Sequence, residues 1–374
     1  MHCLHICNDF SGSKVHSKLY TYLDETGITQ TVYNPIRKET IINNKQVNFK
    51  NKKSKILYSK KLSKKHSLLY KSKIKFLLND FISKNVDPTT FDLIHATTLF
   101  SDGGLALALH KLYKKPYIVT IRSTDLDIFL KYRPDLIFLA KKILQSASKI
   151  IFISNSLKRK FDNHKLVKLV LPNFNNKINI VYNGIDKYWL NNKNKVLKKI
   201  TKPIKILYVG SLIDRKNSIK LCKSIILLNN QETKYELSIV GNGAQKKEIE
   251  QLAKAHNYIN FIGNIYDKTE LKKYYDTHHI FAMPSVRETF GLVYVEALTQ
   301  NLPILYCENE AIDGVFDCKI GSSCQPNVIS IGNEIENIVA SYNNHQINNI
   351  DFNKFNWSII SNEYLSIYNE ILSL

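Results

Sequence analysis

Two glutamates in the second half of the chain, Glu288 and Glu296, are spaced to bind two parts of one ligand. An apolar stretch over 279–283 predicts a strand that ends at Pro284, and apolar spacing over 291–299 predicts a helix. Glu288 then lies on the connecting loop, and Glu296 lies about one and a half turns into the helix. We do not expect them to face each other as an acid–base pair. A sugar nucleotide, with hydroxyls at both ends and phosphates in the middle, is a ligand that both could hold.

Cationic side chains and helix-start amides in the same half suit the phosphates of such a ligand. Arg215 and Lys216 follow a predicted strand. A guanidinium can hold phosphate through two parallel hydrogen bonds, and a lysine adds a point charge. Phe290, Gly291 and Leu292 lie where the predicted helix opens, and N–H groups at a helix start attract anions. The alternative for Arg215 and Lys216 is a solvated pair on an exposed loop.

Five segments carry a resemblance to a known family. In chain order they are 153–156 (ISNS), 181–186 (VYNGID), 209–217 (VGSLIDRKN), 240–243 (VGNG) and 283–298 (MPSVRETFGLVYVEAL). Together they resemble the retaining glycosyltransferases of family 4, and the last is similar to the E-x7-E element of that family. The resemblance implies the α/β fold called GT-B: two doubly wound, Rossmann-like domains that face a cleft, with a C-terminal helix that crosses back to the first domain.

The resemblance also implies roles for the charged residues. Glu288 would accept hydrogen bonds from hydroxyls of the donor sugar, and Glu296 from hydroxyls of the ribose. Lys216 and Arg215 would neutralise the diphosphate. One departure affects this assignment: the residue after Gly210 is often arginine in the family, and here it is Ser211. The resemblance then leaves the role of Arg215 less well defined than that of Lys216.

The nucleoside would meet two further turns of the second half. Gly241 and Gly243 would allow the backbone to approach the ligand closely, although a G-x-G by itself is also an ordinary turn. Ile265 and Tyr266, which follow the next predicted strand, stand where related enzymes contact the base.

The first half would supply acceptor contacts. Arg122 stands where many relatives have a histidine that touches the donor sugar, and Asp125 follows three residues later. Arg122 could bind the donor phosphate or an anionic acceptor, and Asp125 could receive an acceptor hydroxyl; the alternative is a structural Arg–Asp pair. His95 is a further candidate, but a single strand-end histidine is more often structural. Gly12 and Ser13 lie in the first turn and would line the cleft.

Strands and helices alternate through both halves, which predicts two parallel sheets covered on both faces. A length of 374 residues suits two domains. We place the first at 1–198 together with about 356–374, and the second at 199–355. The predicted strands are 2–7, 29–33, 93–96, 117–121, 150–153, 206–209, 236–240, 260–262, 280–283 and 304–306.

Composition limits the compartment and the metal chemistry. No run approaches 18 apolar residues, and the N-terminus predicts a first strand rather than a signal peptide. The six cysteines lack zinc-type spacing, which favours free thiols and the cytoplasm. The second half has no D-x-D element at a strand end, so we expect no cofactor and no metal.

A lysine-rich segment carries much of the net charge of +21. Between Ile41 and Asn79 the chain has twelve lysines and no acidic residue: Lys45, Lys50, Lys52, Lys53, Lys55, Lys60, Lys61, Lys64, Lys65, Lys71, Lys73 and Lys75. Three interpretations stay open: compositional drift, a surface that docks on an anionic membrane at its inner face, and nucleic-acid binding. No aromatic stacking array favours nucleic acid.

The function that these features predict is a metal-independent glycosyltransferase. It would move a hexosyl unit from a nucleoside diphosphate sugar, with UDP favoured, to a glycan or lipid-linked glycan in surface polysaccharide synthesis, with retention implied by the resemblance. A nucleotide-sugar epimerase or a phosphorylase of the same fold is an alternative, although no cofactor-lysine motif supports a phosphorylase. A basic, non-enzymatic protein that binds polyanions is another.

Overall fold

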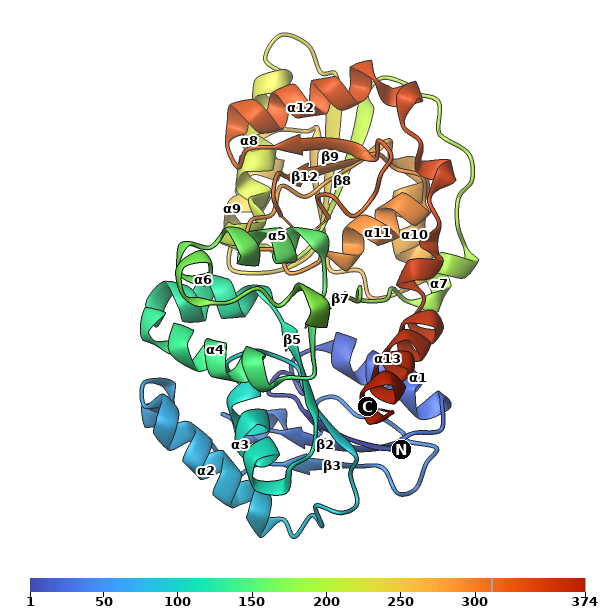
Figure 1. The fold of residues 1–374 in the computed structure, drawn as a ribbon. Helices are drawn as coiled ribbons and strands as arrows, with labels where there is room; N and C mark the ends of the chain where they lie inside the picture. The colour runs from blue at the N-terminus through green and yellow to red at the C-terminus, as the bar shows by residue number, and fades with distance from the viewer. Residues whose placement is uncertain (311, 374) are drawn as a thin grey trace. The chain divides into compact units, whose positions relative to one another are not determined.

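The computed structural model describes residues 1–310 and 312–373, which form two compact units. Unit 1 comprises Met1–Ile153, Leu157–Gly184 and the C-terminal segment from Trp357. Unit 2 comprises Ser154–Ser156 and Ile185–Asn356. Each unit is a parallel sheet with helices on both faces, so the predicted fold class is confirmed (Figure 1).

Unit 1 is built on a seven-stranded sheet in the order β3-β2-β1-β4-β5-β6-β7, with every neighbouring pair parallel. Its strands are β1 (His2–Ile6), β2 (Thr29–Asn34), β3 (Lys55–Tyr58), β4 (Leu93–Ala96), β5 (Tyr117–Ile121), β6 (Lys149–Phe152) and β7 (Ile178–Ile180). The helices associated with this sheet are α1 (Lys14–Glu25), α2 (Tyr70–Ser83), α3 (Gly103–Tyr113), α4 (Ile137–Ser146), α5 (Asn155–Asn163), α6 (Lys165–Val170) and α13 (Trp357–Leu372).

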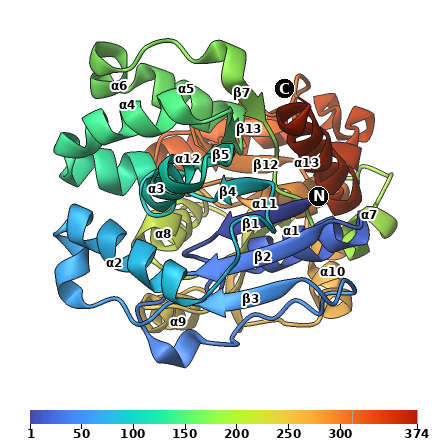
Figure 2. The same ribbon diagram turned by 60° about the horizontal axis from the view of Figure 1, so that its bottom comes forward.

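Alternate strand residues of unit 1 enter two separate cores. Leu4, Ile94 and Val119 pack with α2, α3 and α4 on one face. Cys3 and Ile118 pack with α1 and α13 on the other. Figures 1 and 2 both show α13 lying beside α1. The C-terminal helix therefore returns to the first unit, as the sequence predicted.

Unit 2 is built on a six-stranded parallel sheet in the order β10-β9-β8-β11-β12-β13. Its strands are β8 (Ile204–Val209), β9 (Tyr235–Val240), β10 (Ile259–Gly263), β11 (Ile280–Ala282), β12 (Ile304–Cys307) and β13 (Gly321–Cys324). Its helices are α7 (Lys187–Asn191), α8 (Ser218–Leu228), α9 (Lys246–Ala255), α10 (Lys268–Thr277), α11 (Leu292–Thr299) and α12 (Val328–Ala340).

The chain leaves unit 1 earlier than the boundary at 198 that the sequence suggested. The division falls between Gly184 and Ile185 because the following segment packs on unit 2. Trp189 of α7 is buried and lies edge-on to Tyr275, with ring centroids 5.3 Å apart. The ammonium of Lys198 donates to the carbonyl of His278 at 2.7 Å. These contacts attach the segment that follows Gly184 to the second unit.

Two further expectations concern thiols and membrane spans. All six cysteines are free, as predicted, and five of them are buried. Across the described residues, no helix has the length and apolar character needed to cross a bilayer.

Candidate functional site

The Glu288 carboxylate lies among cations at the carboxyl end of the unit 2 sheet. Lys216 Nζ donates to Glu288 Oε2 and forms an ion pair with it. A guanidinium nitrogen of Arg215 is 3.7 Å from the same oxygen, and Ser285 Oγ donates to it at 3.1 Å. Lys216 is only 8% exposed, so its charge is held in a largely desolvated position. Three of the charged residues that the sequence selected, Glu288, Lys216 and Arg215, are therefore in one cluster with Ser285.

Two loops hold this cluster together. The backbone N–H of Val286 donates to the carbonyl of Arg215 at 2.8 Å, and Asn217 Nδ2 donates to the carbonyl of Pro284 at 2.7 Å. Because these bonds join the loop after β8 to the loop after β11, Lys216 and Glu288 are fixed by backbone contacts as well as by their own charges.

Gly291 sets the direction in which α11 leaves this loop. It has a left-handed φ of +75°, and a Cβ there would lie 2.5 Å from the ring of Tyr294. The helix begins at Leu292, and the N–H of its third residue, Tyr294, donates to the carbonyl of Gly291 at 2.9 Å. Phe290 is buried and its ring lies 5.8 Å from that of Phe355. A helix therefore starts shortly after Glu288, where the sequence predicted one, and anion binding by its N–H groups stays a prediction.

Gly241 and Gly243 pack against the loop after β8. A Cβ at Gly241 would meet the carbonyl of Gly210, and a Cβ at Gly243 would meet the backbone of Leu212. Leu212 N–H donates to the carbonyl of Asn242 at 2.9 Å. Close approach of the two turns is therefore one physical reason for both glycines, and it requires no ligand.

Glu296 has partners different from those of Glu288, in line with the prediction that the two do not form a pair. Burial raises the pKa of Glu296 to about 7, the charge of Asp186 adds to the rise, and Lys268 and the Trp189 indole oppose it. Lys268 Nζ in turn forms an ion pair with Asp186 at 2.6 Å. Sequence reasoning missed Lys268 and Trp189, because no local pattern joins residues so far apart in the chain.

Tyr266 is the most exposed large aromatic residue in the described part of unit 2. Its ring is 88% exposed, and its hydroxyl accepts a hydrogen bond from Asn264 Nδ2 at 3.0 Å. Ile265 beside it is half-buried. An exposed aromatic face between β10 and α10 is suited to stacking on a flat ring such as a nucleobase.

Arg122 lies at the carboxyl end of the unit 1 sheet with much of its guanidinium unpaired. Among the residues that the structure describes, Nε alone has a hydrogen-bond partner, the carbonyl of Thr97 at 3.0 Å. Gly12 lies against Asp9, whose pKa is raised by burial and lowered in turn by the charge of Arg122. Ser13 caps α1 by accepting from the N–H of Val15 at 3.3 Å. The nearby α1 start and guanidinium could together receive an anion.

Asp125 is a correction to the predicted site. Its side chain is fully buried, and its oxygens accept from the backbone N–H groups of Leu99, Phe100 and Arg122 at 3.1, 3.1 and 2.9 Å. Burial raises its pKa to about 6, while these hydrogen bonds oppose the rise. The carboxylate holds the loop after β4 instead of pairing with the Arg122 guanidinium or facing an acceptor.

His95 and Asp102 are structural in the same way. His95 is buried, and its ring nitrogens lie 2.8 Å from Tyr368 Oη and 2.9 Å from Thr120 Oγ1. Asp102, which the sequence did not single out, accepts from Thr97 Oγ1 at 2.8 Å and from Asn8 Nδ2 at 2.9 Å. Both organise the carboxyl ends of the unit 1 strands.

A metal site was not expected, and the described residues contain no group of three or more His, Cys, Asp or Glu side chains that could hold a metal ion. The absence of such a group in this set carries no further conclusion about the reaction. The positive charge beside Glu288 comes from Lys216 and Arg215.

Comparison with known proteins matches each half of the chain to a family model. Residues 17–188 match the family model described as Glycosyltransferase Family 4, and residues 191–348 match the one described as Glycosyl transferases group 1. The chain is 27% identical over 278 residues to the capsular polysaccharide biosynthesis glycosyltransferase CapM of Staphylococcus aureus, and the match covers 68% of this chain and 70% of that protein.

Two other comparisons extend this result. A Bacillus subtilis glycosyltransferase named for teichuronic acid biosynthesis, TuaC, is 23% identical over 230 residues; the match covers 60% of this chain but only 55% of TuaC. The solved sucrose-phosphate synthase of Thermosynechococcus elongatus has a TM-score of 0.74 at 17% identity, with coverage of 100% and 99%, which bears on the fold alone.

The two family models adjoin each other and together cover most of both units, with the charged cluster inside the second match. This chain therefore belongs to glycosyltransferase family 4.

Proposed function

We propose that the protein transfers a hexosyl unit from a nucleoside diphosphate sugar, with UDP favoured, to a hydroxyl of a glycan or lipid-linked glycan in surface polysaccharide synthesis. The names of CapM and TuaC support a capsule or cell-wall polysaccharide as the product. The names also support a transferase over an epimerase or a non-enzymatic polyanion-binding protein.

One observation carries the proposal: Glu288, Lys216 and Arg215 meet at the start of α11. When a glycosyl bond breaks, negative charge develops on the departing diphosphate. Two cations, of which Lys216 is largely desolvated, and the positive end of a helix stabilise that charge more than water would. Glu288 would then accept hydrogen bonds from the donor sugar, with Ser285 and Lys216 fixing the orientation of its carboxylate.

Tyr266, Glu296 and Arg122 would supply the remaining contacts to the donor. Tyr266 would stack on the base, and Glu296 would bind ribose hydroxyls. Arg122 of unit 1, with unpaired guanidinium N–H groups, would bind donor phosphate or an anionic acceptor. No metal is needed in this scheme. Retention of configuration is part of the proposal through family membership, and no side chain in the site is assigned as a base.

Glu288→Gln and Lys216→Met test the donor site. Each should lower transfer from a UDP-sugar by about 10²–10³-fold, the cost of removing one electrostatic contact to a developing charge. The control is Lys272→Met, which removes a half-buried unit 2 cation paired with Asp276. Thermal shifts with UDP, GDP and ADP should identify the base by mass action.

The products separate the alternatives. A transferase consumes the nucleotide sugar in step with an acceptor, whereas an epimerase converts it without one. Full transfer activity in folded Glu288→Gln and Lys216→Met proteins would refute the site assignment. Salt-sensitive nucleic-acid binding without any affinity for nucleotides would favour the polyanion-binding alternative.

We also propose that unit 1 contacts an anionic membrane through the lysine-rich segment. Ten of its twelve lysines are exposed. Lys73 does not belong to the proposed surface, because it is buried and its ammonium donates to the carbonyl of Ser101 at 3.3 Å. Leu68 and Leu69 are 74% and 56% exposed among these lysines. Arg133 Nη1 donates to the carbonyl of Leu68 at 2.8 Å, which attaches a second exposed segment. Basic side chains around exposed leucines suit a lipid surface.

A further inference from the structure

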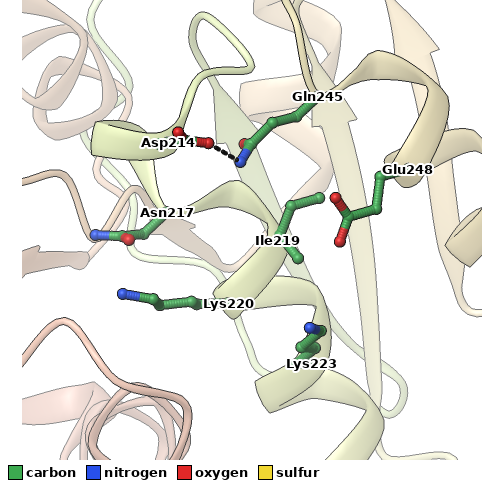
Figure 3. A pocket seen from close by; sticks show the side chains of 7 residues that line it. All are labelled: Asp214, Asn217, Ile219, Lys220, Lys223, Gln245 and Glu248. Atoms are coloured by element: carbon green, nitrogen blue, oxygen red, sulfur yellow. Dashed lines mark hydrogen bonds between the residues drawn. The ribbon is translucent and has the colours of Figure 1, made fainter.

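Unit 2 contains a pocket that is lined in part by Asp214 and Asn217, which lie on the same loop as Lys216. It has a volume of about 300 Å³ and lies between the first turns of α8 and α9 (Figure 3). Its lining residues are Asp214, Asn217, Ile219, Lys220, Lys223, Gln245 and Glu248. Neither Lys216 nor Glu288 lines it, so we treat this α8–α9 pocket as separate from the donor cluster.

The pocket presents hydrogen-bonding groups of both kinds. Among the described residues, the Lys223 ammonium and the Glu248 carboxylate have no hydrogen-bond or ion-pair partner, and both lie at the pocket (Figure 3). Lys220 Nζ donates once, to the carbonyl of Pro326 at 2.8 Å, and keeps further donors. Asp214 engages only Oδ1, which accepts from Gln245 Nε2 at 2.8 Å. The lining thus offers ammonium donors beside carboxylate acceptors.

This lining also has balanced charge and an apolar surface. Two carboxylates face two ammonium groups, so a phosphate would meet repulsion as well as attraction. Ile219 is 8% exposed and gives the pocket a small apolar wall. A sugar ring has the matching chemistry, because each hydroxyl both donates and accepts and the C–H face of the ring is apolar. The volume is at the lower end for small-molecule sites, about 300–1,000 Å³, which suits one sugar residue.

Part of the pocket is held rigidly before any ligand binds. The Gln245 side chain donates to Asp214 and accepts from Ser218 Oγ at 2.9 Å, so both ends of its amide are fixed. Asn217 is buried and tied to Pro284. A site whose groups are already ordered loses less freedom when a ligand binds.

We propose that the α8–α9 pocket binds a neutral sugar residue, as a saccharide site distinct from the donor cluster. The bound sugar would be a residue of the glycan that the proposed transferase acts on. Only this identification of the sugar rests on the proposed function. The binding itself requires neither UDP nor transfer.

Saturation-transfer NMR with D-glucose, D-galactose and N-acetyl-D-glucosamine tests the proposal on the full chain. The first measurement uses the protein saturated with UDP. The second uses the Lys216→Met variant without UDP. Hexose binding at the α8–α9 pocket can then be judged even if the proposed donor site fails. At least one hexose should bind saturably with a dissociation constant on the order of 1–10 mM. Glu248→Gln and Lys223→Met should each weaken it about tenfold, since each removes a charged hydrogen-bonding group.

Lys247→Met and Glu250→Gln are matched controls on α9, because neither residue lines the pocket. Both should bind the hexose as the unchanged protein does. The side chains substituted in these four pocket and control variants are exposed or half-buried, so the four should keep the melting temperature of the unchanged protein. Equal affinity in pocket and control variants would overturn the proposal, as would no saturable hexose signal. Tighter binding of inorganic phosphate than of any hexose would show an anion site instead.

Discussion

At the residue scale, the pairing of Lys216 with Glu288 explains how a desolvated lysine is held ready for an anion. A buried ammonium without a partner is costly, and the carboxylate offsets that cost before a donor arrives. A diphosphate can then share the ammonium, while Ser285 keeps its hydrogen bond to Glu288. Substituting either member leaves the other charge uncompensated, so stability should be measured beside activity in both variants.

The proposed ribose contact of Glu296 should make nucleotide affinity depend on pH. Its pKa is raised by burial to about 7, so about a tenth is ionised at pH 6 and about nine-tenths at pH 8. Ribose hydroxyls donate best to the ionised form, so affinity for UDP should rise by up to about tenfold over this range. Glu296→Gln should remove this contribution to the pH dependence of UDP affinity. The contribution from ionisation of the UDP phosphate should remain. Calorimetry gives the UDP affinity at each pH. Identical pH profiles of this affinity for the unchanged protein and for Glu296→Gln would contradict the proposed ribose contact.

Gly291 should resist substitution more strongly than a glycine with similar backbone in open space. Gly291→Ala combines left-handed strain, about 1–2 kcal/mol, with a clash against the Tyr294 ring. Gly27 has a φ of +85°, and an added Cβ there would have no atom within 4 Å, so Gly27→Ala carries the strain alone. Urea denaturation should show a larger loss for Gly291→Ala, which should also weaken UDP binding. Equal losses of unfolding free energy in Gly291→Ala and Gly27→Ala would mean that the Tyr294 ring moves aside without an energetic cost.

At the element scale, sequence predicted the strands well where hydrophobicity is concentrated. Each of the ten predicted strands is present, with ends within two residues. Three others were missed for physical reasons. β13 (Gly321–Cys324) consists of small residues, β7 (Ile178–Ile180) is short, and β3 (Lys55–Tyr58) lies inside the lysine-rich segment. Pairing with a neighbouring strand, rather than local composition, makes these segments extended.

The candidate site could be predicted only where chemistry is carried by neighbours in sequence. Glu288 and Arg215–Lys216 each lie in the loop that follows a strand, and a parallel sheet brings such loops to one edge. Asp125 was misassigned because its carboxylate serves N–H groups of a loop that lies far away in sequence. The contacts of Glu296 were likewise invisible, since Asp186 and Lys268 come from two other segments.

The attachment of α13 to unit 1 gives an element-scale prediction. Tyr368 Oη and His95 Nδ1 form a buried hydrogen bond, so Tyr368→Phe leaves a buried nitrogen unpaired and should cost about 1–3 kcal/mol. Tyr20 in the same core has a buried hydroxyl without a hydrogen-bond partner among the described residues. Tyr20→Phe should therefore be neutral or stabilising. Urea denaturation checks both, and equal destabilisation by the two variants would rule out this role for the His95 bond.

At the scale of the whole molecule, a net charge of +21 and a dense lysine segment predict salt-dependent binding to anionic vesicles. Leu68→Ser with Leu69→Ser should weaken cosedimentation with vesicles that contain phosphatidylglycerol by about tenfold or more, through lost apolar burial. Leu227→Ser is the control, an exposed leucine of unit 2. Unchanged vesicle binding in the double variant, or equal binding to neutral vesicles, would refute the proposed surface.

The division of the chain has a consequence for how the protein is made. Unit 2 is continuous from Ile185 to Asn356 apart from Ser154–Ser156, whereas unit 1 is completed by α13. During translation, unit 2 can collapse as soon as its last strand and helix leave the ribosome. The unit that is begun first must wait with the part of one sheet face beside α1 uncovered until Tyr364 and Tyr368 have been synthesised. A nascent chain stalled before Trp357 would be a substrate for chaperones through that face.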